Sequence, residues 1–257
     1  MTDRPTDRPT AGRGAGGDME WVGDARLAAG AAWYLEAAFT PGARLGTVYD
    51  DPTTPVVVTR IEEMTEMRVP SGRLVVDVPW DDDDTYRYAR GVPTRPPREL
   101  AVWIPPGVYR VEIAWTAGPY EFFGERFDGV ECAATRLCVS DDPVAGWEMG
   151  VGVVDDVDGL RPGEVPRFGA DANAGCFADA GAWTTLCAPF RTRVDGRWEP
   201  RDRGRLPDGC ERISDESRQA DLVTFTAQSG GVVWLGRTAT GDVATIVVTS
   251  GMTGAKA

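Results

Sequence analysis

The sequence predicts a mainly β fold of the α+β class. We expect an antiparallel β-sandwich-like or meander core, with one N-terminal helix and one short helix after an acidic turn. Among the 257 residues are 31 glycines and 19 prolines, which favours many turns and short elements over a helix bundle. Runs of β-branched and aromatic residues recur between these turns. Alternating strand–helix units are missing from the pattern, which argues against a doubly wound sheet.

The chain divides into three predicted regions. Residues 1–17 repeat Thr-Asp-Arg-Pro and continue into glycine and alanine, so they cannot bury a core and are predicted to be a disordered tail. Residues 18–250 are predicted to form a single β-rich domain, because no strong boundary interrupts them. Residues 251–257 are expected to be a flexible C-terminus.

The first expected element is a helix. Asp24 is placed to cap it, and apolar residues from Leu27 to Ala38 recur at a partly helical spacing. The helix is predicted to continue through about Phe39 and to end at Thr40-Pro41-Gly42. Strand-like patterns then follow, beginning with the β-branched run of residues 55–61.

Two hairpins are predicted next, each from a proline- and glycine-containing turn between strand-like runs. The first joins residues 66–69 and 73–78 through Pro70-Ser71-Gly72, and the second joins residues 100–104 and 108–115 through Pro105-Pro106-Gly107. From Tyr109 to Trp115, aromatic and branched residues alternate with Arg, Glu and Ala. This strict alternation predicts one buried face.

The C-terminal half is predicted to contain further strands and one more helix. Residues 131–140 read as a strand and residues 179–186 as a short helix. The polar stretch of residues 189–220 mixes arginines with acids and is predicted to be a flexible, solvated insertion. Three final strand-like runs, residues 222–227, 232–235 and 243–248, predict a β-meander.

Composition excludes several kinds of function. Histidine is absent, so the chain by itself cannot build a Ser-His-Asp triad, a Cys-His pair or a histidine-ligated metal site. The net charge of −13 disfavours non-specific binding to nucleic acid or to an anionic membrane surface.

Cysteine usage and the N-terminus indicate the compartment. The five cysteines form an odd set without close CxxC pairs, which argues against a disulfide framework or a zinc ribbon. The sequence does not begin with a positively charged segment followed by an apolar run, so we expect no signal peptide. No apolar stretch is long enough to span a membrane. With its arginine-, alanine- and glycine-rich composition, the chain is expected to be a bacterial cytoplasmic protein.

The most suggestive polar motif is the acidic turn between Phe168 and Trp183. Asp171, Asn173 and Asp179 offer oxygen ligands that suit Ca²⁺ or Mg²⁺, and Asp77 could approach them from a strand. The structural alternative is that these aspartates bond nearby backbone N–H groups, as they commonly do in turns. A nucleophilic role for Cys176 lacks a neighbouring base.

Other acidic runs are weaker candidates. The run of four aspartates at residues 81–84 is predicted to be a solvated loop, because adjacent carboxylates repel one another. Residues 154–165 resemble a calcium loop only in part: the twelfth position is Val165 rather than the glutamate that an EF-hand needs.

Four motifs in order are similar to the bacterial family catalogued as domain of unknown function 4241. They are residues 70–77 (PSGRLVVD), residues 105–111 (PPGVYRV), the stretch from Phe168 to Asp179, and Ser229-Gly230 with residues 234–237 (WLGR). The resemblance spans Leu45 to Val248 and implies no assigned activity.

This sequence departs from the family pattern at three places. Glycine is usual in the family where Asn173 stands, which predicts a left-handed turn there, since Gly and Asn reach positive φ most easily. The acid that directly precedes proline in the family is displaced by one residue, as Asp77-Val78-Pro79. The segment at Ser229 lacks the acid of the family's Gly-Asp-Gly turn.

Three functions are compatible with these observations. The first is a noncatalytic binding or interaction domain for an unknown protein or small-molecule partner, with no cofactor. The second is a carboxylate-based hydrolase that uses Mg²⁺ or Ca²⁺, with Asp171, Asn173 and Asp179 as ligands and Asp77 and Ser229 as further candidates. The third is an effector or immunity component of a bacterial conflict system.

Overall fold

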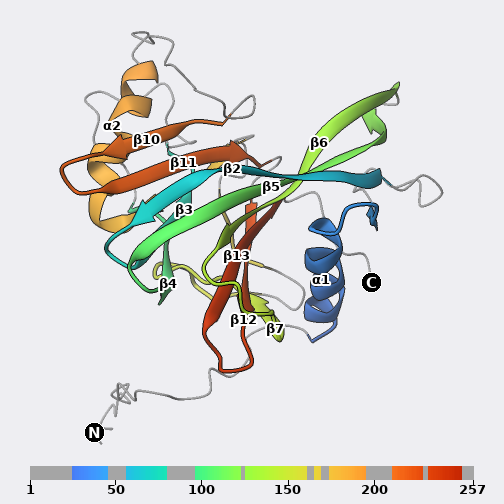
Figure 1. The fold of residues 1–257 in the computed structure, drawn as a ribbon, viewed down its shortest axis with the longest axis horizontal. Helices are drawn as coiled ribbons and strands as arrows, with labels where there is room; N and C mark the ends of the chain where they lie inside the picture. Colours follow the sequence, from blue (N-terminus) through green and yellow to red (C-terminus); the bar gives the residue numbers. More distant parts are fainter. Residues whose placement is uncertain are drawn as a thin grey trace, which may run out of the picture.

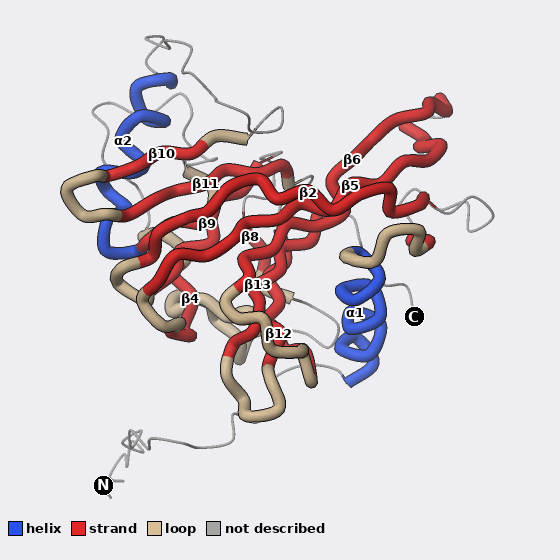
Figure 2. Tube along the Cα trace, viewed as in Figure 1, coloured by secondary structure: helices blue, strands red, loops and turns tan. Residues whose placement is uncertain are grey.

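The computed structural model describes residues 25–45, 56–79, 96–122, 125–160, 165–168, 174–194, 210–227 and 231–250. Within these residues the fold is mostly strand, arranged as two antiparallel sheets with two α-helices (Figures 1 and 2). The predicted mainly β fold with one N-terminal helix and one helix after the acidic turn is confirmed. The predicted tail of residues 1–17 and the predicted C-terminal segment 251–257 lie outside the described residues.

The larger sheet has the strand order β1-β2-β5-β6-β13-β12-β7, with β8 also paired to β12. Its strands are β1 (Arg44–Leu45), β2 (Val56–Val69), β5 (Gly107–Phe122), β6 (Glu125–Cys138), β7 (Gly146–Met149), β8 (Arg167–Phe168), β12 (Gly231–Arg237) and β13 (Val243–Ser250). The long β5–β6 hairpin extends beyond the rest of the sheet (Figure 1).

The smaller sheet has the order β10-β11-β9-β3-β4. Its strands are β10 (Arg212–Asp215), β11 (Ala220–Thr226), β9 (Ala174–Asp179), β3 (Arg73–Asp77) and β4 (Glu99–Trp103). Alternate residues serve two cores: Val76 and Phe177 pack toward the larger sheet, whereas Val75 and Cys176 pack toward helix α2 (Trp183–Val194). Burial on both faces explains why β3 is a nearly continuous apolar run. Residues 174–179 were predicted as part of an acidic turn, but they form β9, a central strand of this sheet.

Helix α1 (Ala25–Ala38) covers the other face of the larger sheet. Leu35 and Ala38 are buried against this sheet, and the Tyr34 hydroxyl donates to the carbonyl oxygen of Ala133 at 3.1 Å. The helix ends within one residue of the predicted boundary. The proposed capping residue Asp24 lies outside the described residues. No helix in the described part of the chain has both the length and the apolar content needed to cross a membrane.

The prediction of two hairpins at the proline–glycine turns is wrong. Strand β2 lies in the larger sheet and β3 in the smaller one, and β4 and β5 are divided in the same way. The two turns therefore carry the chain from one sheet to the other, and they meet where Ile104 N–H donates to the Gly72 carbonyl oxygen at 3.0 Å. Proline and glycine predict that the chain changes direction, but they do not predict which sheet the next strand joins.

The C-terminal predictions were partly correct. β12 and β13 form the expected hairpin, whereas β11, predicted as the first strand of the same meander, belongs to the smaller sheet. The stretch predicted to be irregular contains the end of α2 and all of β10, and the helix is longer than expected. Polar composition misled the prediction, because β10 is an edge strand with an exposed face.

The contact between the crossing turns leads to the first prediction. Gly72 has φ +68°, and a Cβ atom there would lie 2.5 Å from the Ile104 carbonyl oxygen, whereas Gly42 has φ +86° with no atom within 4 Å of such a Cβ. Both substitutions to alanine incur left-handed strain, but only Gly72→Ala also forces the turns apart. We expect Gly72→Ala to lower the free energy of unfolding by at least about 1 kcal/mol more than Gly42→Ala in urea denaturation. Equal losses would contradict the coupling of the two turns.

Candidate functional site

Asp179, a predicted cation ligand, is buried at the end of β9. The residue is 1% exposed, and its Oδ2 accepts a hydrogen bond from the Ser71 backbone N–H at 2.9 Å. Ser71 belongs to the turn that carries the chain from β2 to β3. The carboxylate therefore fastens that crossing turn to the smaller sheet.

Asp77 has a comparable structural position on the other side of the same sheet. Its Oδ1 accepts from the Val78 N–H at 2.9 Å and its Oδ2 from the Arg98 N–H at 2.8 Å. The register places Asp77 opposite Cys176, and Asp179 opposite Leu74. The two aspartates thus lie on opposite faces of the sheet and about 10 Å apart along it, so these two carboxylates do not share one cleft.

The other predicted site residues, Asp171, Asn173 and Ser229, lie outside the described residues. The described residues on either side of these three residues are paired with one another. Phe168 pairs with Gly231, and Ala174 pairs with Thr226. The connections that carry Asp171, Asn173 and Ser229 therefore begin and end beside each other, where the chain passes between the two sheets.

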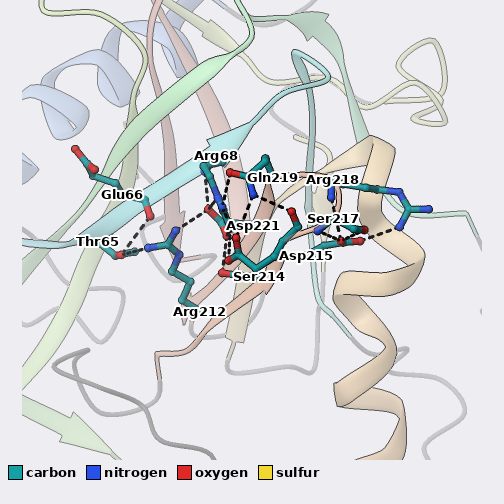
Figure 3. A network of polar contacts seen from close by, with 11 residues as sticks. Thr65, Glu66, Arg68, Arg212, Ser214, Asp215, Ser217, Arg218, Gln219 and Asp221 are labelled. Carbon is teal, nitrogen blue, oxygen red and sulfur yellow. Dashed lines mark hydrogen bonds and ion pairs between the residues drawn. The ribbon is translucent and has the colours of Figure 1, made fainter.

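The most densely connected polar group in the described structure surrounds Asp221, at the start of β11 (Figure 3). Its carboxylate is fully buried and accepts five hydrogen bonds of 2.6 to 2.9 Å. Three come from Arg68, through its backbone N–H, Nε and Nη2, and the others come from Arg212 Nη2 and Ser214 Oγ. A single carboxylate thus orients two guanidinium groups and joins β2 of the larger sheet to the smaller sheet.

The electrostatics of Asp221 follow from these contacts. Burial by itself raises the pKa of the carboxyl, but hydrogen bonds from the side chains of Arg68, Ser214 and Arg212 outweigh that effect and lower it from 3.8 to about 2. The hydrogen bonds that Arg68 donates to Asp221 and Glu216 raise the pKa of its guanidinium. Asp221 is therefore a carboxylate at neutral pH and is poorly suited to exchange protons with a substrate.

The other end of the Arg68 guanidinium faces the exposed β10–β11 turn. Nη1 and Nη2 each donate to a different oxygen of Glu216 at 2.9 Å, and Nη1 also donates to Gln219 Oε1 at 3.1 Å. The hydrogen bond from Arg68 lowers the pKa of Glu216. This end of the network lies at the surface, because the Glu216 side chain is 71% exposed.

A second polar cluster attaches the same turn to α2 (Figure 3). Asp215 accepts from the hydroxyl of Ser217 at 2.6 Å and from Arg218 Nη1 at 2.8 Å, and its Oδ2 lies 2.8 Å from the Thr185 hydroxyl. Hydrogen bonds from Ser217, Arg218 and Thr185 lower the pKa of Asp215. Both ends of the turn are therefore held by carboxylate–arginine contacts.

A buried ion pair ties the segment after β7 to the smaller sheet. Arg98 is 3% exposed, and its Nη2 donates to Asp155 Oδ2 at 2.7 Å and to the Gly150 carbonyl oxygen at 2.6 Å. Asp155 also accepts from the Gly152 N–H at 2.6 Å. The acid within the stretch that resembles a calcium loop is therefore engaged by an arginine.

The cysteine thiols of the described region do not resemble nucleophiles. Cys176 is fully buried, and burial raises its pKa well above the usual 9.0. Burial also raises the pKa of Cys132 to about 12. Both side chains are therefore protonated thiols at neutral pH, whereas the reactive form is the thiolate. Within the described ranges, no group of three or more Cys, Asp or Glu side chains is placed to hold a metal ion.

Arg68, Arg212 and Asp221 were not predicted from the sequence to be site residues. One feature of the sequence could have indicated Asp221: it directly precedes the apolar run of β11. A charged residue beside such a run is unusual, because charged residues are seldom buried without a partner. No spacing rule connects Asp221 with Arg68, because 153 residues separate them. Only the packing of one sheet against the other brings them together.

The fold and these contacts define a two-sheet β domain whose described carboxylates are largely committed to holding strands and turns together. The chain belongs to the family described as "Protein of unknown function (DUF4241)", whose model matches residues 67–249. The resemblance drawn from the four sequence motifs is thus confirmed. No curated protein and no solved structure matches the chain.

The low pKa of Asp221 leads to the second prediction. Because the folded-state pKa lies below the unfolded value, the charged carboxylate contributes stability above about pH 4 and loses it as the pH falls through 2. A pKa difference of this size corresponds to about 2 kcal/mol. We expect Asp221→Asn to be less stable than wild type at pH 7 in urea denaturation, and the difference to shrink between pH 4 and pH 2.

Glu63→Gln is the matched control, because it removes an exposed carboxylate from β2 of the same structure. Its stability difference from wild type is expected to stay within about 0.5 kcal/mol at pH 7. A gap between wild type and Asp221→Asn that does not change with pH would contradict the assignment of Asp221 as a charged tether.

Proposed function

We propose that this protein is a noncatalytic interaction domain that binds another protein. The observation that carries the proposal is an exposed apolar edge between β4 and β5. Trp103 is 69% exposed and Val108 is 58% exposed, and Pro105 and Pro106 between them are exposed as well. Tryptophan is enriched among the residues that dominate binding energy at protein interfaces, and an apolar cluster of this kind is typical of a binding surface.

The geometry of this edge suits a preformed surface. The Trp103 backbone pairs with Arg73 of β3, and Ile104 N–H is bonded to the crossing turn at Gly72. The Tyr109 hydroxyl also donates to the Pro105 carbonyl oxygen. A rigid loop loses little conformational entropy when it binds, which favours affinity.

The use of the predicted acids also supports a noncatalytic role. Asp77 and Asp179, two of the candidate carboxylates, accept backbone N–H groups and stabilise the architecture. The net charge of −13 favours a protein partner over nucleic acid or an anionic membrane. Free thiols, three of them buried, fit a reducing compartment such as the bacterial cytoplasm.

The third prediction tests this surface with two tryptophan variants. Trp103→Ser removes the centre of the apolar edge, and Trp33→Ser removes a comparably exposed tryptophan (58%) from α1 as a matched control. Wild type and both variants serve as bait for cross-linking and quantitative mass spectrometry, and self-association is followed by analytical ultracentrifugation. We expect one partner, or a second copy, to be retained by wild type and Trp33→Ser but reduced at least tenfold by Trp103→Ser, since central anchors contribute about 2 kcal/mol or more. A partner profile that Trp103→Ser leaves unchanged would refute the proposed surface.

A cation-dependent, carboxylate-based hydrolase is the second candidate. One observation favours it: the pairs Phe168–Gly231 and Ala174–Thr226 bring together the ends of the two connections that carry Asp171, Asn173 and Ser229. Carboxylate, amide and hydroxyl oxygens are suitable ligands for Ca²⁺ or Mg²⁺.

The fourth prediction distinguishes this candidate. If Asp171 and Asn173 bind a cation, Ca²⁺ or Mg²⁺ at a hundredfold excess over its Kd should raise the wild-type Tm by about 5 °C or more. The rise should be absent from Asp171→Ala and Asn173→Ala. Asp179→Ala is the control: it should lower the Tm in every buffer, because the Ser71 N–H loses its acceptor, while the cation-induced rise persists. A wild-type Tm that neither cation changes would eliminate the cation site.

A further inference from the structure

The Arg68 guanidinium is held rigidly from one side. Asp221 accepts from its Nε and Nη2 and also from the backbone N–H of the same residue, at 2.8 to 2.9 Å. Asp221 is itself held by Arg212 and Ser214. The plane and position of the guanidinium are thus set by buried contacts, whatever occupies its other end.

The outer end of this guanidinium holds a carboxylate in bidentate geometry. Nη1 and Nη2 reach the two oxygens of Glu216 at equal distances of 2.9 Å, which is the arrangement that arginine favours for a carboxylate. The Arg68 side chain is 18% exposed and that of Glu216 is 71% exposed. Water can therefore compete for Glu216, and an exposed ion pair of this kind is weak.

The turn that presents Glu216 is strained. Gln219 has φ 52° and is the one non-glycine residue with positive φ in the part of the chain that the structure describes. Its amide Nε2 donates to the Glu216 carbonyl oxygen at 2.8 Å and lies 3.2 Å from Glu216 Oε2. Such strain in non-glycine residues is concentrated at ligand sites and switch regions.

We propose that the outer end of Arg68 is a carboxylate-binding site and that Glu216 occupies it as an internal competitor. A carboxylate from another molecule binds Nη1 and Nη2 when the Glu216 side chain turns into solvent. No covalent step is involved, since the exchange replaces one pair of charge-assisted hydrogen bonds with another. The site uses none of the apolar side chains of the edge at Trp103, although the register places Arg68 opposite Val108 of that edge. Its test follows acetate binding at Arg68 and not the retention of a protein partner, so the failure of one proposal is distinguishable from the failure of the other.

Charge and shape select the ligand class. Without Glu216, the two guanidinium groups of Arg68 and Arg212 and the one carboxylate of Asp221 leave a net charge of +1. A monoanion neutralises that charge, and the planar carboxylate matches the two parallel donors of Arg68. Charge and shape therefore select a monocarboxylate, which a peptide offers as an acidic side chain or as a chain terminus.

The fifth prediction compares wild type with Glu216→Ala in the full chain. Sodium acetate is titrated at constant ionic strength while the Arg68 Nε–H resonance is followed by NMR, assigned through its loss in Arg68→Lys. Glu216→Ala should bind acetate at least about fivefold more tightly than wild type, because an intramolecular competitor acts at a high effective concentration. The isosteric Glu216→Gln should give an intermediate affinity.

Glu66→Ala is the matched control, since it removes an exposed glutamate of the same strand two positions from Arg68. It should leave the acetate affinity at the wild-type value, which separates competition at the site from a general change in charge. Two peptide probes identify the source: N-acetyl-Gly-Gly with a free C-terminus, and N-acetyl-glutamic acid amide with only a side-chain carboxylate. The tighter of the two assigns the natural ligand to a chain terminus or to an acidic side chain.

Several outcomes would overturn the proposal. Equal acetate affinities in wild type, Glu216→Ala and Glu66→Ala would show that Glu216 does not compete. A chloride titration that shifts the Arg68 resonance as acetate does would indicate screening instead of a site. Thermal unfolding of Glu216→Ala, followed by circular dichroism, should give the wild-type Tm. An unchanged Tm confirms that any change in acetate affinity reflects the site and not the fold.

Discussion

The buried carboxylate of Asp221 is the contact on which the join between the two sheets depends. An ionised group without partners is costly inside a protein, and this one is tolerated because five donors from three residues surround it. One of these donors is a backbone N–H of β2, so a side chain of the smaller sheet replaces a strand partner at that position. Without the carboxylate, Arg68 and Arg212 would be left close together with no negative charge between them.

The same principle operates at two other places, the crossing turn between β2 and β3 and the segment that leads into β4. A backbone N–H outside the strand ladder has no ladder partner, and a buried N–H without an acceptor is destabilising. Asp179 supplies an acceptor for the β2–β3 turn and Asp77 supplies one for Arg98, next to β4. These acids are therefore explained by the architecture, without any chemistry on a substrate.

What remains exposed defines where the molecule can interact. The apolar edge around Trp103 lies at the crossing turn between β4 and β5, and Arg68 lies just before the crossing turn between β2 and β3. Hydrogen bonds on the buried side hold both of them in place. Strands β3 to β13 fall within the family match of residues 67–249 except for the last residue of β13, whereas α1, β1 and most of β2 precede it. The smaller sheet, most of the larger sheet and the crossing turns thus lie in the matched region, and α1 covers the larger sheet from outside it.

The sequence by itself determined the local elements. Alternating and β-branched runs gave most of the strands, helical spacing gave α1, and proline–glycine pairs marked the turns at residues 70–72 and 105–107. Only the tertiary structure decided that these two turns change sheets, and that Asp77 and Asp179 face opposite sides of one sheet. Strand patterns and turns depend on residues a few positions apart, whereas sheet membership and the Arg68–Asp221 contact depend on packing between residues more than a hundred positions apart, for which the sequence carries no spacing rule.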